Sequence, residues 1–155
     1  MSDFSNIQPA SPAELGTGKP KIGDCNALAL RKAARAVSRF YDEHMAPSGL
    51  RSTQFSLLAI LQDRGGVSVN DIADLLALDR TTAGKNLLPL ERAGYVEVAP
   101  SPEDRRSRQA RLTPAGLKAL KEALPYWVQA QRAFEAANGA EQSAKMREAL
   151  RGVRT

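Results

Sequence analysis

The sequence contains few of the residues from which disulfide frameworks, metal centres and membrane spans are built. Its 155 residues include one cysteine and one histidine, which excludes an intramolecular disulfide and a cluster of soft metal ligands. No run approaches the roughly 20 apolar residues of a membrane span, and the first residues lack the basic and apolar segments of a secretory signal. We therefore expect a soluble, cytoplasmic protein without a metal, a cofactor or a membrane partner.

Residue patterns typical of catalysis are also missing. The single histidine, His44, has Asp42 and Glu43 beside it, but no second soft ligand lies at a helical spacing. No set of serine, histidine and acid can be assembled, and no glycine-rich loop is placed to hold a phosphate. We interpret His44 as an exposed residue near a helix end, and an enzyme is not expected.

Positive charge is the first feature that the chain does have. A net charge of +5 and an isoelectric point near 9.7 favour an anionic partner. Charge alone does not choose between a nucleic acid and an anionic membrane surface. The length and the apolar fraction of 43% suit one domain with a hydrophobic core.

Two short helical patterns stand at the centre of the chain, in residues 68–94. Ser68 can cap the first helix, because a serine side chain accepts a hydrogen bond from a free backbone N–H group of the first turn. The residues Ile72, Leu75 and Leu76 fall at helical spacing, so we expect them to form one buried face. A tight turn and a second helix are predicted to follow.

The second helix is expected to begin after Asp79, whose carboxylate can cap it. Its residues Ala83, Leu87 and Leu90 share one face, which should be buried. The opposite face carries donors suited to base edges and phosphates, although Thr82 is expected to face partly inward. The candidate DNA contacts on this helix are Arg80, Thr81, Thr82, Lys85 and Asn86. Helix-turn-helix is the economical interpretation of the pair.

Beyond Gly94, a residue suited to a left-handed helix end, the apolar pattern changes from a helical to an alternating period. Val96 and Val98 lie two positions apart, as do Ala110 and Leu112, so two strands are predicted around a polar tip. The candidate DNA contacts at this tip are Arg105, Arg106 and Arg108. A basic hairpin beside a helix-turn-helix is typical of a winged helix, whose arginines can reach the DNA backbone or the minor groove.

The runs LDRTT, NLLPLERAGYV and EDRRSRQARLTPAG resemble the MarR family of bacterial winged-helix transcription regulators. The Asp-x-Arg element of that family's wing is matched by Asp104 and Arg106, and its Leu-Thr-x-x-Gly step by Leu112, Thr113 and Gly116. The resemblance implies a homodimer that binds near-palindromic operator DNA. It also implies release from DNA by a small ligand or by oxidation.

Helical patterns flank the central stretch on both sides. One helix is predicted over residues 26–45, and a core helix is predicted to start near residue 52 and to end before Gly65. Residues 67–69 are expected to add a short strand that pairs with the wing. Thr113 followed by proline marks the start of a long helix, and a last short helix follows a break near Gly139.

The flanking helices carry more apolar surface than the central lobe can cover. Exposed stripes of this length are unusual on a soluble monomer. Pairing across a two-fold axis would bury them and would place two recognition helices about one DNA turn, roughly 34 Å, apart. A homodimer is therefore expected, and a monomer with a closed helical cap is the alternative.

The predicted fold class is mainly α with a small β-hairpin wing. It consists of a winged helix-turn-helix DNA-binding lobe flanked by N- and C-terminal dimerisation helices. Residues 1–23 are expected to be a flexible tail, and residues 24–155 a single domain. Within this domain the lobe covers about 48–112, and the dimerisation helices about 26–46 and 114–153.

Two further groups of residues bear on regulation. Cys25 precedes the first helix, where a helix N-terminus lowers the pKa of a thiol, and the resemblance implies a redox-sensing role near this position. An incidental exposed cysteine is the alternative. The resemblance also implies a cleft for an aromatic acid, which Tyr41, His44, Met45 and Trp127 would line. Core packing is the alternative for Tyr41 and Trp127.

The sequence thus predicts a DNA-binding transcription regulator, in the simplest case a repressor. It would act as a homodimer on a near-palindromic operator and would be released by a small aromatic ligand or by oxidation of Cys25. The alternative is a winged helix that serves as a protein-interaction module without specific DNA binding, since a fold does not guarantee a function.

Overall fold

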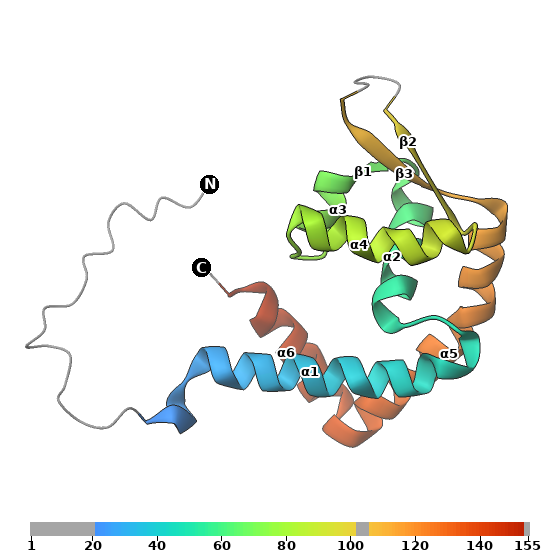
Figure 1. Ribbon diagram of the computed structural model, residues 1–155. Coiled ribbons are helices and arrows are strands. Elements are labelled where there is room, and N and C mark those ends of the chain that lie inside the picture. Colours follow the sequence, from blue (N-terminus) through green and yellow to red (C-terminus); the bar gives the residue numbers. More distant parts are fainter. Residues whose placement is uncertain (1–20, 102–105, 154–155) are drawn as a thin grey trace, which may run out of the picture.

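The computed structural model describes residues 21–101 and 106–153, and these residues form a mainly helical protein with one small sheet (Figure 1). The predicted fold class is confirmed. The helices are α1 (Asn26–Met45), α2 (Ser52–Arg64), α3 (Val69–Leu75), α4 (Arg80–Arg92), α5 (Pro114–Asn138) and α6 (Ala140–Arg151). The strands are β1 (Val67–Ser68), β2 (Val96–Pro100) and β3 (Arg108–Leu112), and the 3-10 turns are η1 (Ile22–Asp24) and η2 (Ala46–Ser48). Residues 1–20, most of the predicted tail, lie outside the described part.

The three strands form an antiparallel sheet in the order β1-β3-β2. The strand predicted near residue 67 is confirmed, because Val67 and Val98 both pair with Ala110 of the central strand. Val67, Val96 and Ala110 are buried. Alternation along β2 and β3 therefore turns one face of the hairpin into the core and leaves the other exposed, as period-two patterning requires.

The hydrophobic core lies beneath α4, between the sheet, α2 and the first half of α5. The inner face predicted for α4 is confirmed, since Ala83, Leu87 and Leu90 are buried. The side chains of Phe55 and Trp127 stack with ring centroids 5.7 Å apart and so join α2 to α5. This packing holds α4 with its opposite face toward solvent.

A hydrogen-bonded junction ties the wing to α5. The Thr113 hydroxyl donates to the carbonyl of Gly94 at 2.7 Å, and the Thr113 backbone N–H donates to the carbonyl of Tyr95 at 3.1 Å. The same hydroxyl accepts from the Gly116 N–H group at 3.0 Å, which makes Thr113 the predicted N-cap of α5. Gly94 has the expected left-handed conformation, with φ 73°.

One sequence-based prediction for α3 is wrong. Ile72 is buried and Leu76 is half-buried, but Leu75 is 40% exposed. The helix spans seven residues, and its C-terminal turn leads through Ala77, which adopts a left-handed φ of 50°. Helical spacing alone does not determine whether neighbouring elements cover the last residue of such a short helix.

The molecule has a lobe and a helical layer, which α5 connects (Figure 1). The sheet projects from one end of the lobe, and α1 lies on the opposite side, with α3 and α4 in between. Helix α5 begins at the wing and contacts α2, then α1 and α6. The Asp42 carboxylate of α1 accepts from both the backbone N–H and the hydroxyl of Ser52, at 2.8 and 2.6 Å, and thereby holds the start of α2.

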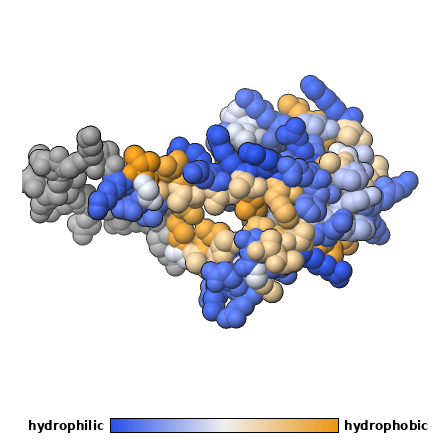
Figure 2. All heavy atoms as spheres, turned by 90° about the horizontal axis from the view of Figure 1, so that it is seen from below, coloured by the Kyte–Doolittle hydropathy of each residue, from blue (hydrophilic) through white to orange (hydrophobic). Residues whose placement is uncertain are grey.

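Large apolar side chains are exposed on the helical layer. Figure 2 shows apolar surface gathered along its underside, the face turned away from the wing. The exposed large apolar residues of η1, α1, α5, α6 and the segment after α6 are Ile22, Leu30, Leu124, Met146, Leu150 and Val153. Among the residues that the structure describes, no helix is long and apolar enough to cross a membrane.

Candidate nucleic-acid interface

Asp79 starts α4 and orients its first turn. The Asp79 carboxylate accepts from the backbone N–H of Thr82 at 2.9 Å and from the Thr82 hydroxyl at 2.6 Å. These bonds stabilise the charged carboxylate, so they lower the pKa of Asp79 from its ordinary value. The result is a helix whose first residues, Arg80 and Thr81, are exposed.

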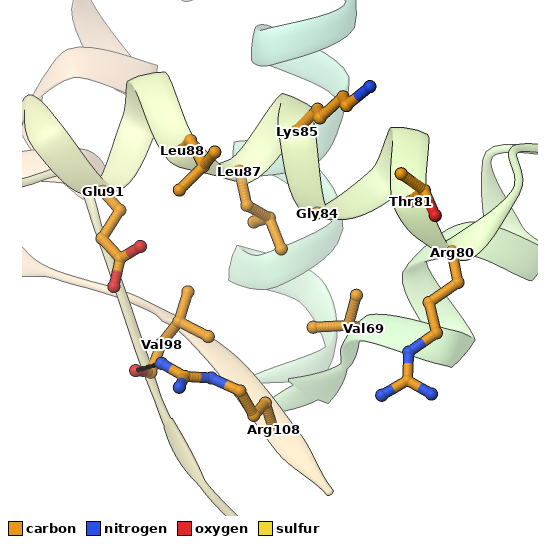
Figure 3. A pocket seen from close by; sticks show the side chains of 10 residues that line it. All are labelled: Val69, Arg80, Thr81, Gly84, Lys85, Leu87, Leu88, Glu91, Val98 and Arg108. Atoms are coloured by element: carbon orange, nitrogen blue, oxygen red, sulfur yellow. Dashed lines mark hydrogen bonds between the residues drawn. The ribbon is translucent and has the colours of Figure 1, made fainter.

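A groove of about 570 Å³ separates the exposed face of α4 from the wing (Figure 3). Its lining residues are Val69, Arg80, Thr81, Gly84, Lys85, Leu87, Leu88, Glu91, Val98 and Arg108. The walls are mostly apolar, with cationic groups at the edges. Basic side chains around a depression beside an exposed helix suit a polyanion that presents phosphates at the rim.

The basic side chains of this groove point in different directions (Figure 3). Arg80 extends from the first residue of α4 toward the wing side of the groove, and Lys85 points away from the wing. Arg108 comes from β3, and its Nη2 donates to the carbonyl of Val98 at 2.9 Å. That bond holds the guanidinium against the hairpin.

A second, smaller cavity of about 160 Å³ opens where the start of β3, next to the tip of the wing, meets α3 and α4. Its lining residues are Val69, Asn70, Arg80, Arg106, Ser107 and Arg108. Three arginines from two distant parts of the sequence thus meet in one place. We call the five polar members of this lining, Asn70, Arg80, Arg106, Ser107 and Arg108, the arginine pocket.

The structure brings together five of the eight candidate DNA contacts. Each of these five lines one of the two cavities or both, and they are Arg80, Thr81, Lys85, Arg106 and Arg108. Thr82 instead uses its hydroxyl in the Asp79 cap, in keeping with the expected inward direction. Asn86 is half-buried and belongs to neither lining. Arg105, like Asp104, lies outside the described residues.

Sequence reasoning missed several members of the interface. Asn70 and Ser107 line the arginine pocket, and Leu88 and Glu91 line the groove. Leu88 is 45% exposed although it is a large apolar residue. The sequence contains a signal for Leu88, because it directly follows the buried Leu87 and therefore points to a different side of the helix. The approach of Asn70 to the wing depends on the pairing of β1 with β3.

The structure describes all four residues predicted to line a ligand cleft. Met45 is fully buried in the core, and Trp127 stacks on Phe55. His44 is half-buried rather than exposed, and its Nδ1 donates to the carbonyl of Phe40 at 2.9 Å. Tyr41 packs near Phe134.

The Tyr41 hydroxyl donates to Oε1 of Gln131, which fixes Tyr41 between α1 and α5. Burial and the nearby Glu135 carboxylate raise the pKa of Tyr41. The alternative of core packing therefore describes Tyr41 and Trp127 in this conformation.

Cys25 is exposed and occupies the N-cap position of α1, without a side-chain capping bond. Across residues 21–101 and 106–153, no group of three or more histidine, cysteine, aspartate or glutamate residues is placed to hold a metal ion.

Comparison with known proteins identifies the family. Residues 48–107 match the sequence model of the MarR family. The chain is similar to the HTH-type transcriptional regulator TtmR of Methylorubrum extorquens, with 34% identity over 119 residues, 75% of this chain and 61% of TtmR. It is also similar to the HTH-type transcriptional repressor IacR of Pseudomonas putida, with 32% identity over 128 residues, 78% of this chain and 77% of IacR.

A solved structure agrees with the sequence relatives. The transcriptional regulator MosR of Mycobacterium tuberculosis, solved in complex with DNA, superposes with a TM-score of 0.69 and 31% identity, over 85% of this chain and all of MosR. Its fold carries the same winged helix-turn-helix. With a relative above 30% identity matched over most of its length, the chain belongs to the MarR family of DNA-binding transcriptional regulators, which are not enzymes.

Proposed function

We propose that the chain is a homodimeric transcription repressor that binds a near-palindromic operator through α4 and the wing. The observation that carries the proposal is the convergence of basic groups from α4 and β3 on one groove. These residues are far apart in the sequence, and their side chains are exposed or only partly buried. The name of the relative IacR, a repressor, supports the direction of regulation.

The dimer is supported by the exposed apolar residues of the helical layer. Leu30, Met146 and Leu150 are each more than a third exposed in one protomer, and the patch seen in Figure 2 lies on the face turned away from the wing. Burial of such a patch against a second copy is favourable in proportion to its area. A two-fold arrangement would leave both recognition helices free to bind successive turns of DNA. The proposed site of action is the cytoplasm.

Fluorescence anisotropy tests the proposal. The duplexes are DNA from immediately upstream of the protein's own gene and a scrambled control, each measured across a series of salt concentrations. Selective binding at two subunits per site, weakening steeply with salt, is the expected result. Equal and weak binding to both duplexes would contradict it. A complete lack of salt-sensitive binding would favour a protein-interaction module, and a protein partner would then be sought.

Two versions of regulation accompany the proposal. In one, a small aromatic ligand pulls the recognition helices out of register. In the other, an oxidant converts Cys25, which is exposed, to a sulfenic acid or an intermolecular disulfide. Peroxide selects between them: loss of operator binding in the wild type and not in Cys25→Ser supports oxidation, while equal behaviour of both proteins removes Cys25 from the mechanism.

A further inference from the structure

The arginine pocket joins the recognition helix to the wing. Arg80 is the first residue of α4, and Arg106 and Arg108 belong to the returning side of the hairpin. Asn70, in the first turn of α3, and Ser107 add uncharged polar groups to the same lining. Among the described residues of this lining, three are arginines and none is a carboxylate.

Asp71 and Asp79, which adjoin this lining in the sequence, each accept a hydrogen bond near the start of a helix. The Asp79 carboxylate accepts both hydrogen bonds from Thr82, and the Asp71 carboxylate accepts from the Ser68 hydroxyl at 2.7 Å. Among the described residues, Arg80 makes no ion pair. The guanidinium of Arg80 is therefore available to an external anion.

We propose that the arginine pocket seats one phosphodiester group of the DNA backbone, and that Arg80 contacts this phosphate rather than a base edge. The inference rests on the proposed DNA-binding function and refines it. A guanidinium presents donors in a planar fork that matches phosphate oxygens, and Arg108 keeps further N–H donors beyond the one that bonds to Val98.

The direction of the side chains separates Arg80 from the other exposed residues of α4. Arg80 reaches toward the wing, whereas Lys85 points away from it (Figure 3). A phosphate held between α4 and the hairpin would fix how deeply the helix enters the major groove, because backbone contacts set register and orientation without reading sequence. The residues on the side of α4 that faces away from the wing, with Lys85 among them, would then contact the base edges.

Substitution of Arg80 tests the assignment. Arg80→Ala should weaken binding to the operator and to the scrambled duplex by the same factor, about tenfold, and should reduce the slope of log K against log salt by about one unit. Arg35→Ala is the matched control, because it removes the same charge from the exposed face of α1 and should leave the slope unchanged. A loss that depends on a single base pair would make Arg80 a base reader and overturn the inference.

Neutral backbone linkages locate the phosphate. Methylphosphonates are placed one at a time along both strands of the operator, and each duplex is titrated with the wild type, Arg80→Ala and Arg108→Ala. One symmetry-related pair of positions should weaken the wild type about tenfold and should cause no further loss in either variant, as expected of one shared contact. If no position suppresses the effects of both variants, the pocket does not seat a backbone phosphate.

Inorganic phosphate distinguishes a DNA phosphate from a free anion. The melting temperature of the full chain is measured in phosphate and in chloride at equal ionic strength, for the wild type and Arg80→Ala. Stabilisation by phosphate that requires Arg80, without a sensitive methylphosphonate position, would assign the pocket to a free anion and overturn the inference. Failure of the proposed function itself has a different signature, since the wild type would then show no selective binding to any duplex.

Discussion

Gly116 is the residue at which the wing and α5 come closest. A Cβ atom at this position would lie 2.0 Å from the carbonyl oxygen of Tyr95 and 2.8 Å from Cδ1 of Leu112. The first neighbour is backbone, held in place by its bond from the Thr113 N–H group, so it cannot move aside as a flexible side chain would. Glycine is required here by close approach rather than by backbone conformation.

Gly116→Ala should lower the free energy of unfolding by about 3 kcal/mol, the upper end of the cost of overpacking a well-packed site. Gly84→Ala is the control: it lies inside α4 with nothing within 4 Å of its Cβ position, and it should raise stability by about 1 kcal/mol through helix propensity. Urea denaturation followed by circular dichroism measures both. Equal stability of the two variants would contradict the close approach at Gly116.

Ser143 of α6 has a fully buried side chain whose hydroxyl has no hydrogen-bond partner among the described residues. A buried polar group without a partner has lost its hydration and gained nothing in return. Ser143→Ala should therefore stabilise the protein by about 1–2 kcal/mol. Ser38→Ala, at an exposed position of α1, measures the gain from helix propensity alone, and a gain at Ser143 no greater than at Ser38 would show that the hydroxyl is satisfied.

At the scale of single elements, local chemistry determines where α4 and α5 begin. Asp79 caps α4 and Thr113 caps α5, and both were predicted from the side chains alone. A capping group acts over three residues, so the sequence contains all the information needed. The exposure of Leu75 was not predictable in this way, because it depends on which neighbouring elements cover the end of α3.

The capping of α4 should depend on pH through Asp79. Its folded-state pKa is lowered below the ordinary value of 3.8, so the cap contributes stability above that pH. As the pH falls, the unfolded chain takes up the proton first, and the contribution is lost toward the folded-state pKa. Asp79→Asn keeps an acceptor oxygen but cannot titrate.

Urea midpoints of the wild type and Asp79→Asn, measured from pH 7 down to pH 2.5, test this dependence. The advantage of the wild type should be constant above about pH 5 and should shrink below the ordinary pKa of an aspartate. Parallel curves across the whole range would mean that the charge of Asp79 does not contribute to the cap.

At the scale of the whole molecule, the exposed leucines of the helical layer define what a second copy would cover. Leu150 of α6 is 49% exposed and Leu30 of α1 is 43% exposed. An isolated protomer would leave both in contact with water, at a cost proportional to their apolar area. The proposed dimer removes this cost and supplies the two-fold symmetry that a near-palindromic operator requires.

Leu150→Glu should weaken self-association by at least about tenfold, because a charge in an apolar interface must be desolvated without a partner. Leu75→Glu makes the same change at an exposed leucine of the DNA-binding lobe and should leave the dimer intact. Sedimentation equilibrium measures both variants, and circular dichroism checks that each remains folded. A dimer of unchanged affinity in Leu150→Glu would place the interface elsewhere.

The sequence by itself determined the helix starts, the wing strands and the basic character of α4, because capping, strand alternation and charge are local properties of the chain. Tertiary structure alone decided which basic residues meet. Arg80 and Arg108 are 28 positions apart in the sequence, and they line one pocket only because β1 pairs with β3 and brings the start of α3 beside the start of β3. Tertiary packing likewise decided that Met45 is fully buried and that Trp127 stacks on Phe55, since burial depends on every element that covers a side chain.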